Sequence, residues 1–166
     1  ASSAIELLAD ELEGLLANAV ERQLVADVPV GIMLSGGVDS SLITALASRA
    51  CQGVRTFTVS FPGAGRLDES AHARLIADYF GTDHTEIAAE EVSVDLLPLL
   101  ARQYDEPLID SSMVPTFLVS QQIRRHCTVA LGGDGADELF GGYRQYNRLL
   151  TQERRSSLLP LLLRRS

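Results

Sequence analysis

The chain has 166 residues, of which 46% are hydrophobic and 22% charged, and its net charge at pH 7 is −8. This is the length of a single domain with a core of its own. The 14 basic residues, all of them arginine, are outnumbered by 22 acidic residues, which argues against general binding of nucleic acid. No apolar run approaches the roughly 20 residues that cross a membrane, so we expect a cytoplasmic protein that binds no membrane.

The first part of the chain is predicted to form a helix, a strand and a second helix. Apolar residues recur at helical spacing from Ile5 to Ala19, and Pro29 follows the end of this helix. The continuous apolar run from Val30 to Leu34 predicts a buried strand, and a helix is predicted from about Asp39 to Ala50.

Strands and helices are expected to alternate in the rest of the chain. The predicted strands are Val54 to Phe61, His84 to Ala88 and Cys127 to Leu131. The predicted helices are Leu67 to Phe80, Val92 to Tyr104 with a kink or break at Pro98, Pro115 to His126, and one from Asp137 onward that is interrupted at Gly141-Gly142. The predicted fold class is therefore α/β, with an open, mostly parallel, Rossmann-like sheet that has helices on both faces.

A glycine-serine loop, S-G-G-V-D-S-S, runs from Ser35 to Ser41, directly after the first predicted strand. Backbone N–H groups at such a strand-to-helix turn can bind phosphate, and the two glycines let the chain fold tightly around it. Asp39 would repel bare phosphate but suits the Mg²⁺ that accompanies it. The lysine of G-x-x-x-x-G-K-[ST] is absent, so a phosphate-binding loop of another class is predicted. In the alternative interpretation, Asp39 and Ser40 are ordinary helix caps.

A second glycine-rich loop, G-G-D-G-A-D-E-L-F-G-G-Y, runs from Gly132 to Tyr143 after another apolar strand. Its acids Asp134, Asp137 and Glu138 are candidate Mg²⁺ ligands. Ligands of open α/β sheets bind at the carboxyl ends of the strands, so the two loops are expected to share one edge and Asp39 and Asp137 to share one ion. The alternative is a turn in which Asp137 and Glu138 favour a helix N-terminus.

The remaining residues that could carry chemistry are the cysteines and histidines. Cys51 and Cys127 lack C-x-x-C spacing and are expected to be buried small apolar residues. His72, His84 and His126 lie outside both loops, and solvated or capping roles are expected for them.

The first loop resembles the pyrophosphate loop of the N-type ATP pyrophosphatases. A longer series of motifs resembles the asparagine synthetase family, and in chain order these motifs are D-V-P-V-G before the first loop, S-F followed by D-E-S, D-E-P, and the second loop. Together they cover about Asp27 to Tyr146. The resemblance implies part of a synthetase domain that uses ATP and Mg²⁺ to adenylate a carboxylate, aspartate by family default. Ammonia from glutamine then forms the amide.

The resemblance also implies roles for individual residues. Nucleotide and pyrophosphate contacts are expected at Leu34, Ser35, Gly36, Gly37, Asp39, Ser40, Val59, Gly132 and Gly133. Asp39 and Asp137 correspond to Mg²⁺ ligands, and Asp134 to an acidic residue of the adenylation step, so these three are the expected catalytic residues. Gly132 departs from the serine of many members. Asp68, Asp105 and Asp110 are weaker candidates that could equally cap a helix or turn.

The resemblance implies a larger protein with a glutaminase domain. That domain begins with a cysteine nucleophile, and Ala1 is not that residue, so nothing in this chain is expected to hydrolyse glutamine. We expect residues 1–150 to form the pyrophosphatase-type part and 151–166 to begin a missing C-terminal part, so the fragment alone should be inactive. Whether the protein is a homodimer stays open. The alternatives are another enzyme with this loop (GMP, NAD or argininosuccinate synthetase, or a β-lactam synthetase) and a non-catalytic ATP-binding module.

Overall fold

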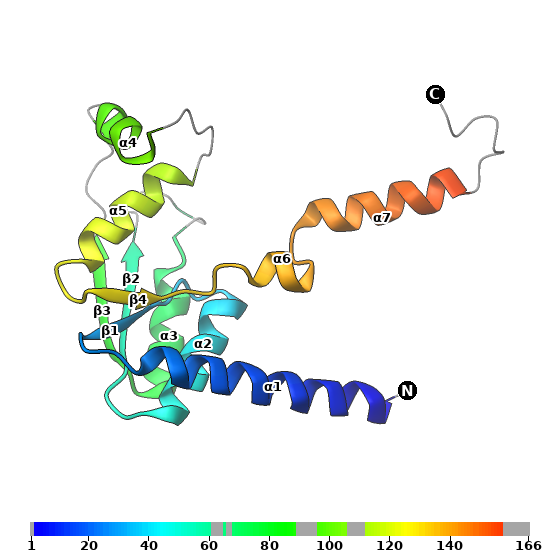
Figure 1. Cartoon of the computed structure of the whole chain (residues 1–166), viewed down its shortest axis with the longest axis horizontal. Helices are drawn as coiled ribbons and strands as arrows, with labels where there is room; N and C mark the ends of the chain where they lie inside the picture. Colours follow the sequence, from blue (N-terminus) through cyan, green and yellow to red (C-terminus); the bar gives the residue numbers. More distant parts are fainter. Residues whose placement is uncertain (1, 61–64, 66–67, 89–95, 106–111, 158–166) are drawn as a thin grey trace. The chain divides into compact units, whose positions relative to one another are not determined.

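The computed structural model describes residues 2–60, 65, 68–88, 96–105 and 112–157 (Figure 1). By Cα packing the chain divides into two compact units, Ala1–Gly132 and Gly133–Ser166. The elements of the first unit are α1 (Ser2–Leu24), β1 (Val30–Met33), α2 (Val38–Ala50), β2 (Arg55–Ser60), α3 (Ser70–Phe80), β3 (Asp83–Ala88), α4 (Leu96–Tyr104), α5 (Met113–Ile123) and β4 (Val129–Leu131). They confirm the predicted alternation of strands and helices.

The four strands form one sheet in the order β3-β2-β1-β4, and every neighbouring pair is parallel. The register pairs Ile32 of β1 with Thr56 of β2 on one side and with Leu131 of β4 on the other. The predicted parallel sheet is therefore confirmed. Because all strands point the same way, the segments that follow β1, β2 and β4 leave the sheet at one edge.

Helices cover both faces of this sheet, as the sequence predicts. On one face, Ile32 packs with residues of α1 and α2, and Leu34, directly after β1, packs against α3. The other face is covered by α5 (Figure 1), and Met33 and Phe57 pack against residues of this helix. Alternate residues of β1 thus enter separate cores, which explains why the strand reads as a continuous apolar run.

The second unit contains two helices, α6 (Ala136–Phe140) and α7 (Arg144–Ser157). Gly141 follows α6 with φ of 69°, a left-handed conformation that glycine adopts readily, and the helix cannot continue through it. The predicted interruption at Gly141-Gly142 is confirmed. The predicted border near residue 150 stays a prediction, because the two units describe packing inside this chain and not the domains of a longer protein.

The predicted environment of Cys51 is wrong. Cys127 is buried as expected, but Cys51 is exposed. It lies at the C-cap of α2 in an extended conformation, where the chain leaves the helix before β2 begins. Only the face of α2 that packs against the sheet contributes to the core. Cys51 lies beyond the end of that face, so its small apolar side chain stays exposed.

The solvated role expected for His84 is also wrong. His84 lies in β3, with its Nδ1 2.9 Å from Thr56 Oγ1, while its Nε2 is buried and has no hydrogen-bond partner in the described part of the chain. Burial lowers the pKa of His84 from its ordinary value, and nearby Arg74 lowers it further. Arg74 is itself paired with Glu86, whose carboxylate lies 2.7 Å from its guanidinium.

Two further features complete the fold. Pro98 lies in the first turn of α4, where a missing N–H removes no helical hydrogen bond, and the preceding residues 92–95 lie outside the described residues. Among the helices that the structure describes, none is both long and apolar enough to cross a membrane.

Candidate functional site

The strand order reverses direction at β1. β2 and β3 follow on one side of it and β4 lies on the other, so β1 and β4 flank the topological switch point of the sheet. Ligands of open α/β sheets bind outside the carboxyl ends of the strands at this point. Ser35 follows β1 there, and Gly132 follows β4. The expectation that both glycine loops start at one sheet edge is confirmed for their first residues.

Serine hydroxyls hold the loop after β1 in shape. The backbone N–H of Ser35 donates to Ser40 Oγ over 3.2 Å, and the two serine hydroxyls lie 3.0 Å apart. Ser35 Oγ also accepts from the N–H of Gly37 over 3.3 Å, and Ser41 Oγ donates to Gly37 O over 2.6 Å. Ser40 is buried, so its structural role here is to fix the turn.

Gly36 is required in this loop by both its conformation and its neighbours. Its φ is +85°, and a Cβ at this position would lie 2.8 Å from the backbone N of Ala73 and 2.9 Å from His72 Cβ. Both neighbours belong to the first turns of α3. The loop therefore lies directly against α3, and a side chain at residue 36 would separate them.

The loop ends in a helix N-terminus whose backbone donors are available. Gly37 is the N-cap of α2 and makes no side-chain cap, and the first helical bond runs from Ser41 N to Gly37 O over 3.1 Å. The N–H groups of residues 38–40 precede that bond and have no carbonyl within the helix to reach. Asp39 and Ser40 thus follow the cap and do not form it. This arrangement suits a phosphate group.

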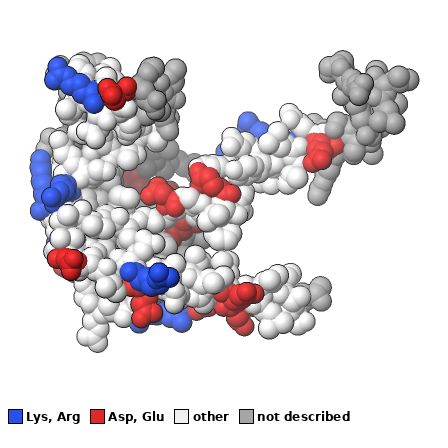
Figure 2. Space-filling model, viewed as in Figure 1, with Lys and Arg blue, Asp and Glu red and all other residues white. Residues whose placement is uncertain are grey.

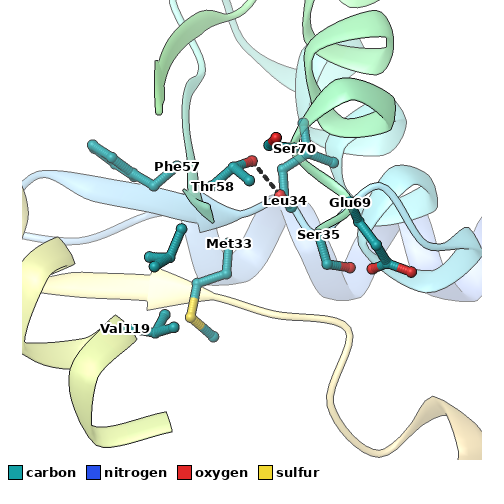
Figure 3. Close-up of a pocket in the computed structure, with 9 residues that line it drawn as sticks. Met33, Leu34, Ser35, Phe57, Thr58, Glu69, Ser70 and Val119 are labelled. Carbon is teal, nitrogen blue, oxygen red and sulfur yellow. Dashed lines mark hydrogen bonds between the residues drawn. The ribbon is translucent and has the colours of Figure 1, made fainter. Parts of the chain in front are cut away.

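A pocket of about 190 Å³ opens beside this loop (Figure 3). Its lining residues come from the ends of β1 and β2, the start of α3 and the middle of α5: Met33, Leu34, Ser35, Phe57, Thr58, Val59, Glu69, Ser70 and Val119. The Thr58 hydroxyl is occupied, because it donates to the Leu34 carbonyl. The walls are mainly apolar, whereas Ser35, Glu69 and Ser70 form a polar side near the loop.

The pocket contains Leu34, Ser35 and Val59, three of the residues for which nucleotide contacts are expected. The other six lining residues were missed: Met33, Phe57, Thr58, Glu69, Ser70 and Val119. Met33 follows two buried residues in an apolar strand, and Val119 comes from a helix that is distant in sequence, so no local pattern marks either one. Glu69 stands in the D-E-S motif, which is the signal that could have found it.

The weaker acidic candidates are partly explained as structural residues. Asp68 Oδ1 accepts a hydrogen bond of 3.0 Å from the N–H of Ser70, so Asp68 fixes the turn that leads into α3. Asp105 ends α4 with a left-handed φ of 55°. Asp110 lies outside the described residues.

In the second unit, Asp137 lies in the first turn of α6 and its carboxylate occupies the space beside Gly142. A Cβ on Gly142 would overlap Asp137 Oδ1, which explains why glycine follows this helix. Glu138 has a different role. Its carboxylate accepts a hydrogen bond of 2.6 Å from the Tyr143 hydroxyl, which lowers the pKa of Glu138 and raises the pKa of Tyr143 to about 12.

The metal assignments stay predictions. Within the described residues, no group of three or more His, Cys, Asp or Glu side chains forms a ready metal site. Mg²⁺ commonly uses only one or two carboxylates and completes its shell with water and substrate phosphates, so Asp39 and Asp137 remain suitable ligands by type. Asp134 is exposed in the same loop as Asp137, and Gly133 begins the second unit.

Comparisons with known proteins identify relatives of the whole segment. The asparagine synthase family model matches residues 11–166. A putative glutamine-hydrolyzing asparagine synthetase of Mycobacterium tuberculosis is 40% identical over 158 residues, covering 95% of this chain and 24% of that protein. Asparagine synthetase 1 of Bacillus subtilis is 36% identical over 145 residues, and the alignment covers 87% of this chain and 23% of that protein. The chain thus spans about a quarter of the curated relatives it matches.

Solved structures support the fold independently. An NH3-dependent NAD synthetase from Campylobacter jejuni superposes with a TM-score of 0.52 at 16% identity, over 81% of this chain and 60% of that one. A glutamine-dependent NAD+ synthetase from Acinetobacter baumannii, solved with ADP, superposes with a TM-score of 0.54 at 20% identity. The superposition covers 77% of this chain and 26% of that one. At these identities only the fold is shared. The family match, which includes both glycine loops, goes further: this chain belongs to the asparagine synthase family.

Proposed function

We propose that this chain is the ATP-binding part of an amide-forming ligase that adenylates a carboxylate, aspartate by family default, and releases pyrophosphate. Ammonia then attacks the acyl-AMP to give the amide. The observation that carries the proposal is the uncapped N-terminus of α2, preceded by Gly36 with a positive φ, at the switch point of the sheet and beside a largely apolar pocket. A phosphate chain and an adenine base need these two environments side by side.

The loop residues would bind the phosphates of ATP through backbone groups that the turn holds in place. The N–H groups at the start of α2 donate to the β and γ phosphates and favour negative charge as pyrophosphate leaves. Gly36 and Gly37 let the backbone approach, and Ser35 and Ser40 keep the turn rigid. Leu34 and Val59 line the pocket for the base. Gly132 and Gly133 begin the segment that follows β4 and are proposed to contact the nucleotide.

The exposed Asp39 carboxylate at the first turn of α2 fits a cation that accompanies phosphate. We assign Asp39 and Asp137 as the Mg²⁺ ligands and Asp134 to the adenylation step. When bound, Mg²⁺ would offset the charge that develops on the departing pyrophosphate.

The setting of the reaction is proposed from the relatives. Their names include glutamine hydrolysis, so ammonia would come from glutamine through a glutaminase domain of the full-length protein. We place the protein in the cytoplasm and the end of this pyrophosphatase-type part near residue 150. The face shown in Figure 2 carries small interspersed groups of acidic and arginine side chains without a broad positive surface, which agrees with small-molecule substrates.

An isotope experiment tests the reaction class. Full-length protein is supplied with ATP, ammonia and an ¹⁸O-labelled carboxylate substrate, and the products are analysed by mass spectrometry. Adenylation predicts that one ¹⁸O per turnover moves into AMP. Label in inorganic phosphate would show that an acyl phosphate forms instead, and the proposal would be wrong.

A different enzyme with this loop is the second candidate, because both NAD synthetase structures share the fold. Turnover of nicotinate adenine dinucleotide with ammonia, but not of aspartate, would favour it over amide formation on an amino acid. A non-catalytic module is the third. ATP affinity measured by calorimetry with and without Mg²⁺ separates it from both enzymes, since only an intact metal site makes binding depend on the ion.

A further inference from the structure

The pocket beside the glycine loop contains one charged side chain, that of Glu69, among its described lining residues (Figure 3). Its carboxylate lies on the polar side with Ser35, and both side chains point away from the apolar walls made by Met33 and Val119. Among the described residues, no hydrogen bond or ion pair engages the Glu69 carboxylate. Glu69 is exposed, so its carboxylate is accessible to a ligand that enters the pocket.

The backbone holds Glu69 firmly at this place. Its carbonyl accepts the first helical hydrogen bond of α3, from Ala73 N over 3.0 Å, and lies 3.2 Å from the position that a Cβ on Gly36 would occupy. Asp68 fixes the following turn through the N–H of Ser70. The segment therefore packs against the phosphate loop, and the side chain of residue 69 starts from a fixed point.

The order of groups in ATP restricts what this carboxylate can bind. With the phosphates on the loop and the base against Leu34 and Val59, the ribose lies between the loop and the apolar walls, which is the side that Ser35 and Glu69 occupy. A carboxylate repels phosphate and accepts hydrogen bonds only. The vicinal hydroxyls of ribose are paired donors that a carboxylate can accept together.

We propose that Glu69 recognises the ribose of ATP by accepting hydrogen bonds from its 2′ and 3′ hydroxyls. The inference rests on the proposed function, because it takes ATP as the ligand of this pocket. It makes Glu69 a residue for nucleotide binding and for selection of ribonucleotides over deoxyribonucleotides. It assigns no proton transfer to Glu69 and no contact with the carboxylate substrate.

Ligand analogues combined with variants test the assignment. The dissociation constants of ATP and of 2′,3′-dideoxy-ATP are measured by calorimetry with Mg²⁺ for full-length wild-type protein, Glu69→Gln and Glu69→Ala. Hydrogen bonds to a charged group predict that Glu69→Ala weakens ATP binding about tenfold or more. Glu69→Gln should lose less, and the dideoxy analogue should bind all three proteins alike. Glu21→Gln, on exposed α1, controls for the loss of one negative charge.

The outcomes separate this inference from the proposed function. Equal weakening of ATP and the dideoxy analogue in Glu69→Ala, unchanged binding of both, or tighter binding of both would overturn the ribose assignment alone. Purine riboside triphosphate lacks the amino group of adenine. If the wild-type protein binds it as weakly as Glu69→Ala binds ATP, the carboxylate contacts the base instead of the ribose. Wild-type protein that binds no ATP would overturn the proposed function itself.

Discussion

Replacing Gly36 by alanine should destabilise the protein because residue 36 has both a left-handed backbone and backbone neighbours. A left-handed φ costs a residue with a Cβ about 1–2 kcal/mol. The new Cβ would also lie 2.8 Å from Ala73 N and 3.2 Å from Glu69 O. These atoms belong to the first turn of α3 and cannot rotate away, so overpacking adds about 1–3 kcal/mol. We expect a loss of about 2–5 kcal/mol in the free energy of unfolding.

Gly37 provides the matched control. Its φ is −71°, and a Cβ there would meet only Ser35 Oγ, at 3.4 Å. Alanine is less favourable than glycine at an N-cap, so Gly37→Ala should cost about 1 kcal/mol or less, which is clearly less than Gly36→Ala. Urea unfolding followed by circular dichroism compares the variants, and ATP titration of the folded proteins shows whether the loop still binds. Equal unfolding free energies for the two alanine variants would refute this account of the loop.

Three further predictions concern other parts of the chain. Gly31→Ala should cost about 1–3 kcal/mol in urea unfolding, because its Cβ would overlap the ring of Phe57, and unchanged stability would contradict the packing described for β1. A Cβ on Gly142 would displace the Asp137 carboxylate, so under the proposed assignment of Asp137 as an Mg²⁺ ligand, Gly142→Ala should weaken the Mg²⁺ dependence of ATP binding nearly as much as Asp137→Asn. A normal Mg²⁺ titration for Gly142→Ala, with Asp137→Asn impaired, would contradict this. Burial lowers the pKa of His84 below 6.5, so the unfolded chain takes up the proton first. The contribution of His84 to the free energy of unfolding should be complete above pH 6.5. It should decrease as the pH drops from 6.5 toward the lower pKa that His84 has in the folded chain. His84→Gln should flatten this fall, and parallel pH profiles for both proteins would exclude the assignment.

The sequence predicts the elements and the sheet well, because β1 is a continuous apolar run, β2 is rich in β-branched and aromatic residues, and the helices between the strands have clear stop signals. Gly81 ends α3 in a left-handed conformation, and Gly141 ends α6 in the same way. Such local signals depend on nearby residues alone. The loop from Ser35 to Ser41 also forms the predicted turn between a strand and a helix.

The sequence does not predict features that depend on how distant elements pack. Val119 reaches the pocket only because α5 covers the β1–β2 face, and Cys51 is exposed because of its place at the end of α2. The contact between Gly36 and α3 also joins separate segments. The two glycines were predicted to admit phosphate, whereas the structure adds that one of them is needed for helix packing.

The most direct test of the central claim is a crystal structure of the full-length protein with ATP and Mg²⁺. The account predicts that the β and γ phosphates lie within hydrogen-bond distance of the N–H groups at the start of α2, with the adenine against Leu34 and Val59. Phosphates bound away from this loop, or an adenine outside that pocket, would contradict it.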